Sequence, residues 1–180
     1  MPKALDPATE RIIDQWMLPF NTGEMAPLWD VVHPRCTNYP VLKGQQLLPG
    51  EGPEVFERVV SMLRTGFPND LKFSKDGVEE VTLEDIEYIL ECFKTPPFDE
   101  VCPDDIEETI IAFLTEAGKK VLLKATLAGT NEGAFLGQIT NRHTIDRQLH
   151  LLVIDENGLI AGHGGCRNDL ERARRLGLSQ

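Results

Sequence analysis

The chain has 180 residues, a mass of 20.1 kDa and a formal net charge of −11, from 29 acidic and 18 basic side chains. This acidity argues against nucleic acid as a partner, because binding a phosphate backbone requires clustered Lys and Arg. Hydrophobic residues make up 41% of the chain, and no apolar run approaches the ~20 residues that span a bilayer. We therefore expect one domain, residues 1–180, with no membrane span, no secretory signal and a cytoplasmic location by default.

Helices are predicted in the first third of the chain, where apolar residues recur at helical spacing. They cover residues 7–20, 25–32 and 54–66. Asp6 followed by Pro7 is typical of an N-cap and a first helical residue, and Pro34 ends the second helix. Between the second and third helices, residues 35–53 are rich in Pro and Gly and are predicted to form a loop.

Most of the remaining chain has the patterns of strands. These strands cover residues 71–74, 106–116, 119–130, 144–155 and 159–163. Ala117-Gly118 is expected to join the second and third strands in a hairpin, and Asn157-Gly158 the last two. Residues 169–176 form a short Arg-rich helix at the end. Helices followed by a mostly antiparallel sheet define an α+β fold.

One helix interrupts the strands. Residues 82–93 are strongly amphipathic, with Thr82 as the N-cap, and a Pro-rich segment follows. Fourteen carboxylates and a single basic residue, Lys94, lie within residues 76–116. We interpret this charge as a solvated surface rather than as an acidic docking patch.

The strand over residues 144–155 carries the candidate site. Side chains alternate along a strand, so Asp146, Gln148 and His150 share one face. Two interpretations remain open: a sheet with one wetted face, or a polar strip that lines a closed pocket. In the second, an imidazole can move a proton and an amide can hold an oxyanion. No metal site is expected, because His143 faces away from His150 and Asp146.

Short pieces of the sequence follow an order and spacing typical of one protein family. They are Phe20-Asn21-Thr22-Gly23, His33-Pro34, Asn38 with Pro40, Gly52-Pro53, Phe67-Pro68, residues 128–137, Gln148-Leu149-His150, Asn157-Gly158, His163 and residues 174–177. On these residues the chain resembles the SnoaL-like polyketide cyclases, or ester cyclases, of the nuclear-transport-factor-2-like superfamily. Residues 79–105 lie outside the resemblance and are interpreted as an insertion.

The resemblance implies an α+β fold of the nuclear-transport-factor-2-like kind. In this fold, helices wrap a curved, mostly antiparallel sheet into a cone-shaped barrel, here with an inserted helix near residues 82–93. Such a cone encloses a cavity, and the strand over residues 144–155 would form its wall.

Members of this family close a ring by intramolecular aldol condensation on polyketide esters in secondary metabolism, without a metal or a cofactor. The resemblance assigns catalytic roles to Asn38, Gln148 and His150, and it places the family's acid/base aspartate at Gly165, which cannot transfer a proton. His150 would then be the base, because its unperturbed pKa of about 6.5 suits neutral pH. Gln148 and Asn38 would stabilise the enolate oxygen. The expected substrate-binding residues are Asp146, His163, Asn168, Asp169 and Trp16.

We therefore expect a cofactor-independent cyclase or isomerase that transfers a proton next to the carbonyl of a polyketide-like substrate. One alternative is a binding protein for a hydrophobic ligand that has lost catalysis, because Gly165 replaces the aspartate. Another is a small-molecule hydrolase or dehydratase in which His150 activates water. The expected partner is a hydrophobic small molecule, and a homodimer or higher homo-oligomer follows from the resemblance.

Overall fold

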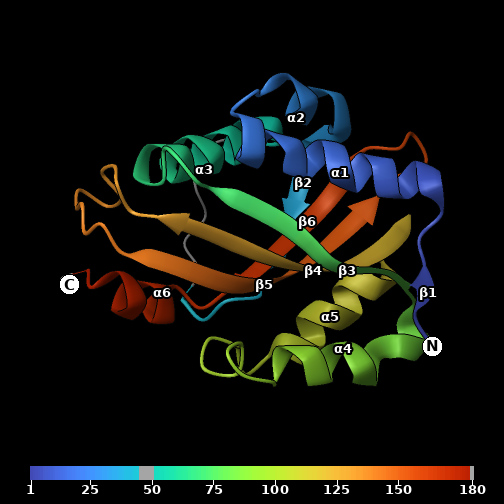
Figure 1. Cartoon of the computed structure of the whole chain (residues 1–180). Coiled ribbons are helices and arrows are strands. Elements are labelled where there is room, and N and C mark those ends of the chain that lie inside the picture. The colour runs from blue at the N-terminus through green and yellow to red at the C-terminus, as the bar shows by residue number, and fades with distance from the viewer. Residues whose placement is uncertain (45–50, 179–180) are drawn as a thin grey trace.

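The computed structural model describes residues 1–44 and 51–178. In these residues, helices pack around one six-stranded sheet (Figure 1). The helices are α1 (Pro7–Thr22), α2 (Ala26–Val31), α3 (Pro53–Gly66), the 3₁₀ helix η1 (Leu83–Asp85), α4 (Ile86–Phe93), α5 (Ile106–Thr115) and α6 (Asp169–Leu176). The strands are β1 (Lys3–Ala4), β2 (Val32–Asn38), β3 (Lys72–Val81), β4 (Lys119–Thr130), β5 (His143–Ile154) and β6 (Ile160–Arg167). None of the described helices has the length and apolar character that a membrane crossing requires.

The sheet is curved but open. Its strand order is β1-β3-β4-β5-β6-β2, and all neighbouring pairs are antiparallel except β2 and β6. Within the described residues the two edge strands, β1 and β2, do not pair with each other. The predicted α+β fold with a curved, mostly antiparallel sheet is confirmed, whereas the closure implied by the word barrel is wrong.

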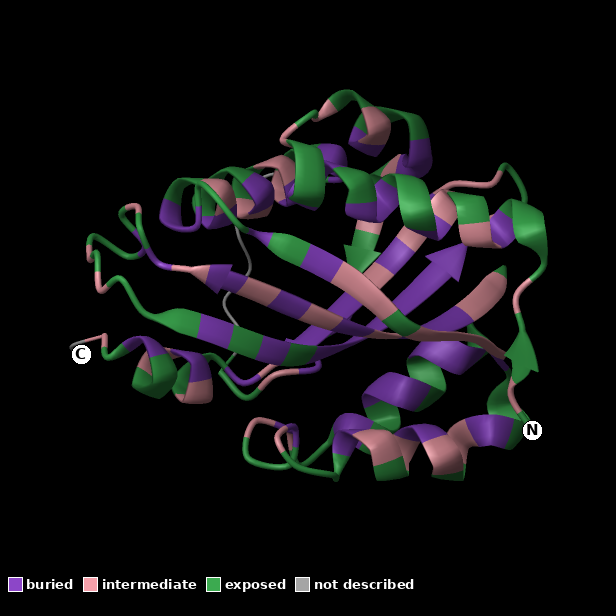
Figure 2. Cartoon of the chain, in the orientation of Figure 1, coloured by how far each residue is buried: buried purple, intermediate pink, exposed green. Residues whose placement is uncertain are grey.

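Helices cover both faces of the sheet. α1, α2 and α3 lie over one face, and α4 and α5 lie against the other (Figure 1). Buried apolar side chains fill both interfaces, so the central strands are buried along much of their length (Figure 2). The first interface includes Trp16, Phe56 and Phe73, and the second includes Ile110 and Leu151.

α6 takes the place of a strand beside the first half of β5. The β5–β6 ladder runs from Gln148 to Ile154, and the chain enters α6 at Asn168 after β6 ends. Arg175 of α6 donates to the backbone carbonyl of Ile145. This contact satisfies a polar group on an edge that no strand covers there.

Several predicted boundaries are confirmed together with their local causes. Asp6 caps α1 by accepting a hydrogen bond from the backbone N–H of Thr9 at 2.9 Å. Thr82 and Asp85 form a capping box that starts η1, which leads directly into α4. Gly158 turns the β5–β6 hairpin with a φ of 76°, in the left-handed region that glycine adopts at little cost.

The predicted strand over residues 106–116 is wrong, because this segment is helix α5. Ile106, Ile110 and Phe113 recur at helical spacing and face the sheet, where each is buried. The β-branched residues of the segment favour a strand, but burial of one helical face outweighs that weak preference. The predicted hairpin around Ala117-Gly118 therefore does not form, and β4 pairs with β3 and β5.

The predicted loop over residues 35–53 is wrong at its start. Val32–Asn38 is strand β2, which runs parallel to β6 with an irregularity between Val32 and Thr37. Pro34 is tolerated because β2 is an edge strand and Pro34 lies in the irregular stretch between Val32 and Thr37, where no residue is paired in register with β6. Residues 45–50 of the predicted loop lie outside the described residues.

Candidate functional site

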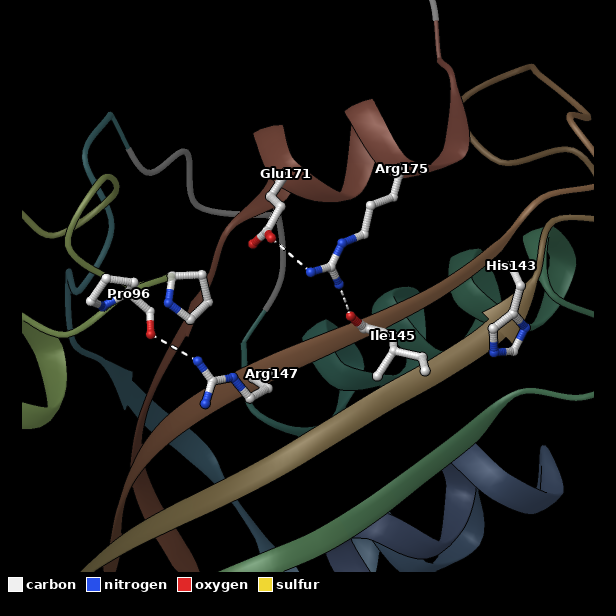
Figure 3. A pocket seen from close by; sticks show the side chains of 7 residues that line it. Pro96, His143, Ile145, Arg147, Glu171 and Arg175 are labelled. Carbon is white, nitrogen blue, oxygen red and sulfur yellow. Dashed lines mark hydrogen bonds and ion pairs between the residues drawn. The ribbon is translucent and has the colours of Figure 1, made fainter.

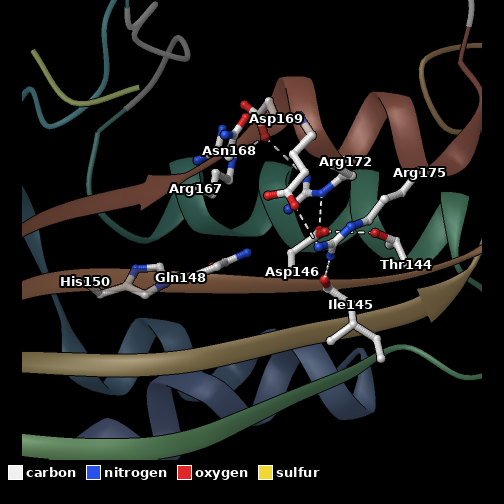
Figure 4. Close-up of polar contacts among 11 residues, drawn as sticks. Thr144, Ile145, Asp146, Gln148, His150, Arg167, Asn168, Asp169, Arg172 and Arg175 are labelled. Carbon is white, nitrogen blue, oxygen red and sulfur yellow. Dashed lines mark hydrogen bonds and ion pairs between the residues drawn. The ribbon is translucent and has the colours of Figure 1, made fainter. Parts of the chain in front are cut away.

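β5 directs its three polar candidates toward the face that α1 and α3 cover. The side chains of Asp146, Gln148 and His150 are each 7% exposed, so this face is not wetted. The prediction that these three residues share one face is confirmed, and that face is buried. Figure 4 shows Gln148 between His150 and a polar cluster around Asp146.

Gln148, His150 and His163 form a continuous hydrogen-bonded chain. Nε2 of His150 lies 2.8 Å from Oε1 of Gln148. Nδ1 of His150 lies 2.9 Å from Nε2 of His163, on the neighbouring strand β6. We assign the protons from this network: His150 donates from Nε2 to the amide oxygen, and His163 donates from Nε2 to His150.

Aromatic rings surround the two imidazoles. The ring centroid of Trp16 lies 5.3 Å from the centroids of both His150 and His163. Phe73 packs edge-on against His150 at 5.8 Å, and Phe56 against His163 at 5.0 Å. His150 therefore lies among aromatic rings.

Burial keeps both imidazoles neutral near pH 7. It is the main cause that lowers the pKa of His150 well below 6.5, and the neighbouring His163 and Arg167 lower it further. Burial and the Arg167 charge lower the pKa of His163 to about 3. Neutral imidazoles each carry one donor and one acceptor nitrogen, which is what the hydrogen-bonded chain requires.

Gly165 lies directly opposite His150 in the β5–β6 ladder. A Cβ at this position would lie 3.2 Å from Cε1 and Nδ1 of His150 and 3.2 Å from Cε1 of His163. The two imidazoles thus occupy the space into which a side chain at residue 165 would extend.

Asp146 belongs to a second cluster, centred on α6. Its carboxylate accepts hydrogen bonds from Arg172 and, at 2.8 Å, from the hydroxyl of Thr144 (Figure 4). Both members of the Asp146–Arg172 ion pair are buried. This pair fastens α6 to β5.

Asn168 and Asp169, both predicted to bind substrate, also serve α6. Asn168 caps the helix and donates to the carbonyl of Pro97 and to Glu100, each at 3.0 Å. The carboxylate of Asp169 is exposed and pairs with Arg167 at 2.9 Å. Neither residue contacts the histidine pair through a hydrogen bond among the described residues.

Asn38, a predicted catalytic residue, lies at the sheet edge. It pairs in register with His163, so its side chain emerges on the same face of the sheet, but it is exposed. Arg167 was missed by the sequence reasoning, although it follows His163 and Gly165 at strand spacing and faces the same side. The alternation of side chains along β6 was the pattern that could have identified Arg167.

A surface pocket of about 580 Å³ lies on the opposite face of β5. Its lining residues are Pro96, Pro97, His143, Ile145, Arg147, Glu171 and Arg175 (Figure 3). None of the residues predicted to be catalytic lines this pocket. His143 faces away from His150 as expected, and Nδ1 of His143 lies 3.0 Å from the hydroxyl of Thr130.

No protein-family model matches the sequence, and no curated protein sequence matches it significantly. Solved structures do match. TsrD from Streptomyces laurentii superposes with a TM-score of 0.63 at 17% identity, over 98% of this chain and 100% of that chain. A protein from Jannaschia sp. CCS1, provisionally named a SnoaL-like polyketide cyclase, gives 0.59 at 14% identity, over 99% of each chain.

A third structure carries a different name. AclR from Streptomyces galilaeus, provisionally named a hydroxylase, gives a TM-score of 0.59 at 14% identity, over 96% of this chain and 86% of that chain. At these identities the likeness establishes the fold alone. The chain has the same fold as these SnoaL-like proteins, and proteins with different names share that fold.

Proposed function

We propose that the protein is a SnoaL-like cyclase or isomerase that transfers a proton at a carbon next to a carbonyl of a polyketide-like substrate. The observation that carries this proposal is the buried chain of an amide and two neutral imidazoles formed by Gln148, His150 and His163. The names of several structural neighbours as polyketide cyclases support the same substrate class.

The chemistry of such a reaction suits these groups. An intramolecular aldol step needs a base to remove an α-proton and an acid to protonate the new alkoxide, each contributing about 10²- to 10⁴-fold. A neutral imidazole can do both in turn. Amide and guanidinium N–H groups, as in Gln148, Asn38 and Arg167, can stabilise the enolate oxygen. The reaction requires no cofactor.

The remaining predicted residues take supporting roles in this proposal. Trp16 packs on both imidazoles and would contribute an apolar wall. Asp146, Asn168 and Asp169 would act indirectly, by holding α6 and the Arg167 side chain in place.

One observation favours a second function. Gly165 stands where the resembling family has its acid/base aspartate, and rings fill the space beside His150. A protein of this kind could bind a hydrophobic ligand without reacting with it. A hydrolase or dehydratase that activates water at the histidine pair is a third candidate function.

A direct test measures exchange of the α-proton for deuterium in a β-keto ester by NMR in D₂O. We expect the protein to accelerate exchange, and His150→Gln and His163→Gln each to slow it, at least one of them by ~10² or more. His33→Gln is the matched control, because it removes an imidazole outside the pair. No acceleration over buffer, together with a hydrophobic ligand detected by native mass spectrometry, would favour the binding function.

The oligomeric state and the domain organisation remain predictions. We propose a homodimer or a higher homo-oligomer of a single SnoaL-like domain with an insertion over residues 79–105, located in the cytoplasm. Light scattering during gel filtration measures the number of copies.

A further inference from the structure

His150 has no ring nitrogen available for a ligand. Nε2 is hydrogen-bonded to Gln148, and Nδ1 is hydrogen-bonded to His163. The side chain is 7% exposed. A general base must come within about 3 Å of the proton that it removes. In the observed arrangement, His150 cannot reach a substrate unless one of its two partners moves away.

His163 differs in this respect. Its Nε2 is bonded to His150, but its Nδ1 has no hydrogen-bond partner among the described residues. In this part of the chain, the fully buried side-chain nitrogens and oxygens without a partner are Nε1 of Trp16 and the hydroxyl of Tyr39. His163 is half-buried, and its Nδ1 forms the outer end of the hydrogen-bonded chain.

Two hydrogen-bond donors share the face of the sheet that carries His163. Asn38 is its register partner on the edge strand β2, and Arg167 follows four residues later on the same face of β6. Arg167 bonds Asp169 through Nε, whereas its terminal nitrogens make no hydrogen bond among the described residues. The N–H groups of Asn38 lie beside His163 and those of Arg167 lie farther along β6, opposite Gln148, so both can stabilise negative charge on a substrate that extends along this face.

We infer that Nδ1 of His163, rather than His150, exchanges the proton with the substrate, and that His150 is a positioning residue. This inference rests on the proposed proton transfer next to a carbonyl. The substrate C–H bond breaks, its electron pair forms the enolate, and the proton bonds to Nδ1 of His163. The resulting His163 imidazolium donates a hydrogen bond from its Nε2–H to Nδ1 of His150. After ring closure it returns the proton to the alkoxide oxygen, which regenerates neutral His163.

The orientation of the Gln148 amide determines which atoms donate and which accept in the hydrogen bonds between Gln148, His150 and His163. With its amide oxygen toward His150, both imidazoles carry their proton on Nε2, and Nδ1 of His163 is an acceptor. Turning the amide presents NH₂ to His150, moves the ring protons to Nδ1, and makes Nδ1 of His163 a donor. One amide rotation thus converts the outer nitrogen from a base into an acid, and both are needed in an aldol cycle.

The nitrogen assignment is tested on the protein alone by long-range ¹H–¹⁵N NMR with ¹⁵N-labelled histidine. The chain has four histidines, so single His→Gln variants assign every signal. We expect His150 and His163 to remain neutral at pH 6, each protonated on Nε2, and Nδ1 of His163 to lack a hydrogen bond. An Nδ1 of His163 that is hydrogen-bonded, or a His150 with a free nitrogen, would overturn the inference.

The roles are tested by asparagine variants, because the asparagine amide lies near the position of Nδ1. His150→Asn can still accept from Nε2 of His163, so we expect α-proton exchange of a β-keto ester to fall by about tenfold or less. His163→Asn should lose ~10² or more. The ¹⁵N signals of His163 should also change in His150→Asn, which a purely structural role would not require. Circular dichroism checks that each variant is folded.

Different results would contradict the proposed function and the assignment of the base to His163. If the unmodified protein does not accelerate exchange of the β-keto ester, the proposed function fails for this probe, and the NMR assignment still decides whether the outer nitrogen is free. If exchange is accelerated but His150→Asn loses more activity than His163→Asn, the proposed function stands and the assignment of the base to His163 is overturned.

Discussion

Gly165 faces His150 across the β5–β6 ladder, and a Cβ at residue 165 would lie 3.2 Å from Nδ1 of His150. Nδ1 is the atom that bonds His163 at 2.9 Å. The absence of a side chain at residue 165 therefore allows the two imidazoles to meet. In the resembling family, an acid/base aspartate is expected at this position. Here the histidine pair fills the same space.

Gly165→Ala should destabilise the protein. A Cβ contact of 3.2 Å is tighter than ordinary van der Waals contact, so the two rings must shift, and overpacking typically costs about 1–3 kcal/mol. Urea unfolding measures the change. Gly77→Ala is the matched control, because its Cβ would have Lys124 as its nearest neighbour at 3.9 Å. Equal stability changes in both variants would contradict the crowding argument.

Gly165→Asp tests whether the protein is catalytically active or has lost catalysis together with the aspartate. We expect this larger side chain to break the His150–His163 hydrogen bond and to lower α-proton exchange, because it enters the space that the rings occupy. The measurement is the exchange rate of a β-keto ester in D₂O. A gain of cyclisation or exchange in this variant would instead show that the aspartate had been lost together with catalysis.

The stability of the protein should fall as the pH falls below 6.5. Folding lowers the pKa of both His150 and His163 below 6.5, so in that range the unfolded chain binds protons that the folded protein does not. Each buried histidine then removes up to ~1.4 kcal/mol of stability per pH unit. Above about pH 6.5 both states are neutral at these sites, and the effect vanishes.

Urea unfolding between pH 7.5 and roughly pH 5.5 measures this slope, above the range where most carboxylates titrate. In His150→Gln and His163→Gln the slope should be smaller, by an amount that corresponds to one proton. His33→Gln is the control and should retain the full slope. A slope that is unchanged in both pair variants would show that the imidazoles are not the groups that take up protons.

Gln148→Glu should raise the pKa of His150. It replaces a neutral oxygen, 2.8 Å from Nε2, by a carboxylate, and a close opposite charge favours the imidazolium. The carboxylate accepts hydrogen bonds but donates none, so it also fixes the proton of His150 on Nε2. Histidine ¹⁵N shifts followed against pH measure both effects. In Gln148→Met, which removes the hydrogen bond without adding charge, the pKa of His150 should stay low.

Breaking the Asp146–Arg172 pair should be costly. Both side chains are buried, and removing one partner leaves an uncompensated charge, which typically costs about 3–5 kcal/mol. We expect Arg172→Met to show this loss in urea unfolding. The double variant with Asp146→Leu should recover most of it, because no charge is then left buried.

The exposed ion pair between Glu54 and Arg58 provides the control for that experiment. Arg58→Met should change the free energy of unfolding by less than about 1 kcal/mol, since solvent screens an exposed pair. If Arg172→Met is as mild as this variant, the Asp146–Arg172 contact does not fasten α6 as the structure indicates.

The sequence determined those features that local spacing encodes. The helical repeat before Phe20, the Asp6 and Thr82 caps and the Asn157-Gly158 turn each fix an element within a few residues. The alternation along β5 was enough to predict that Asp146, Gln148 and His150 share a face. Local sequence failed at α5, because a short segment rich in isoleucine and threonine fits a helix or a strand until its buried face is known.

Only the tertiary structure decided which polar residues meet. Gln148 and His150 are near neighbours on one strand, but His163 reaches them through the pairing of β5 with β6. Asp146 is just as close to Gln148 in sequence, yet it pairs with Arg172 of α6. The reason is physical: side-chain parity is local to a strand, whereas register, sheet curvature and the packing of helices on both faces depend on contacts between residues far apart in the chain.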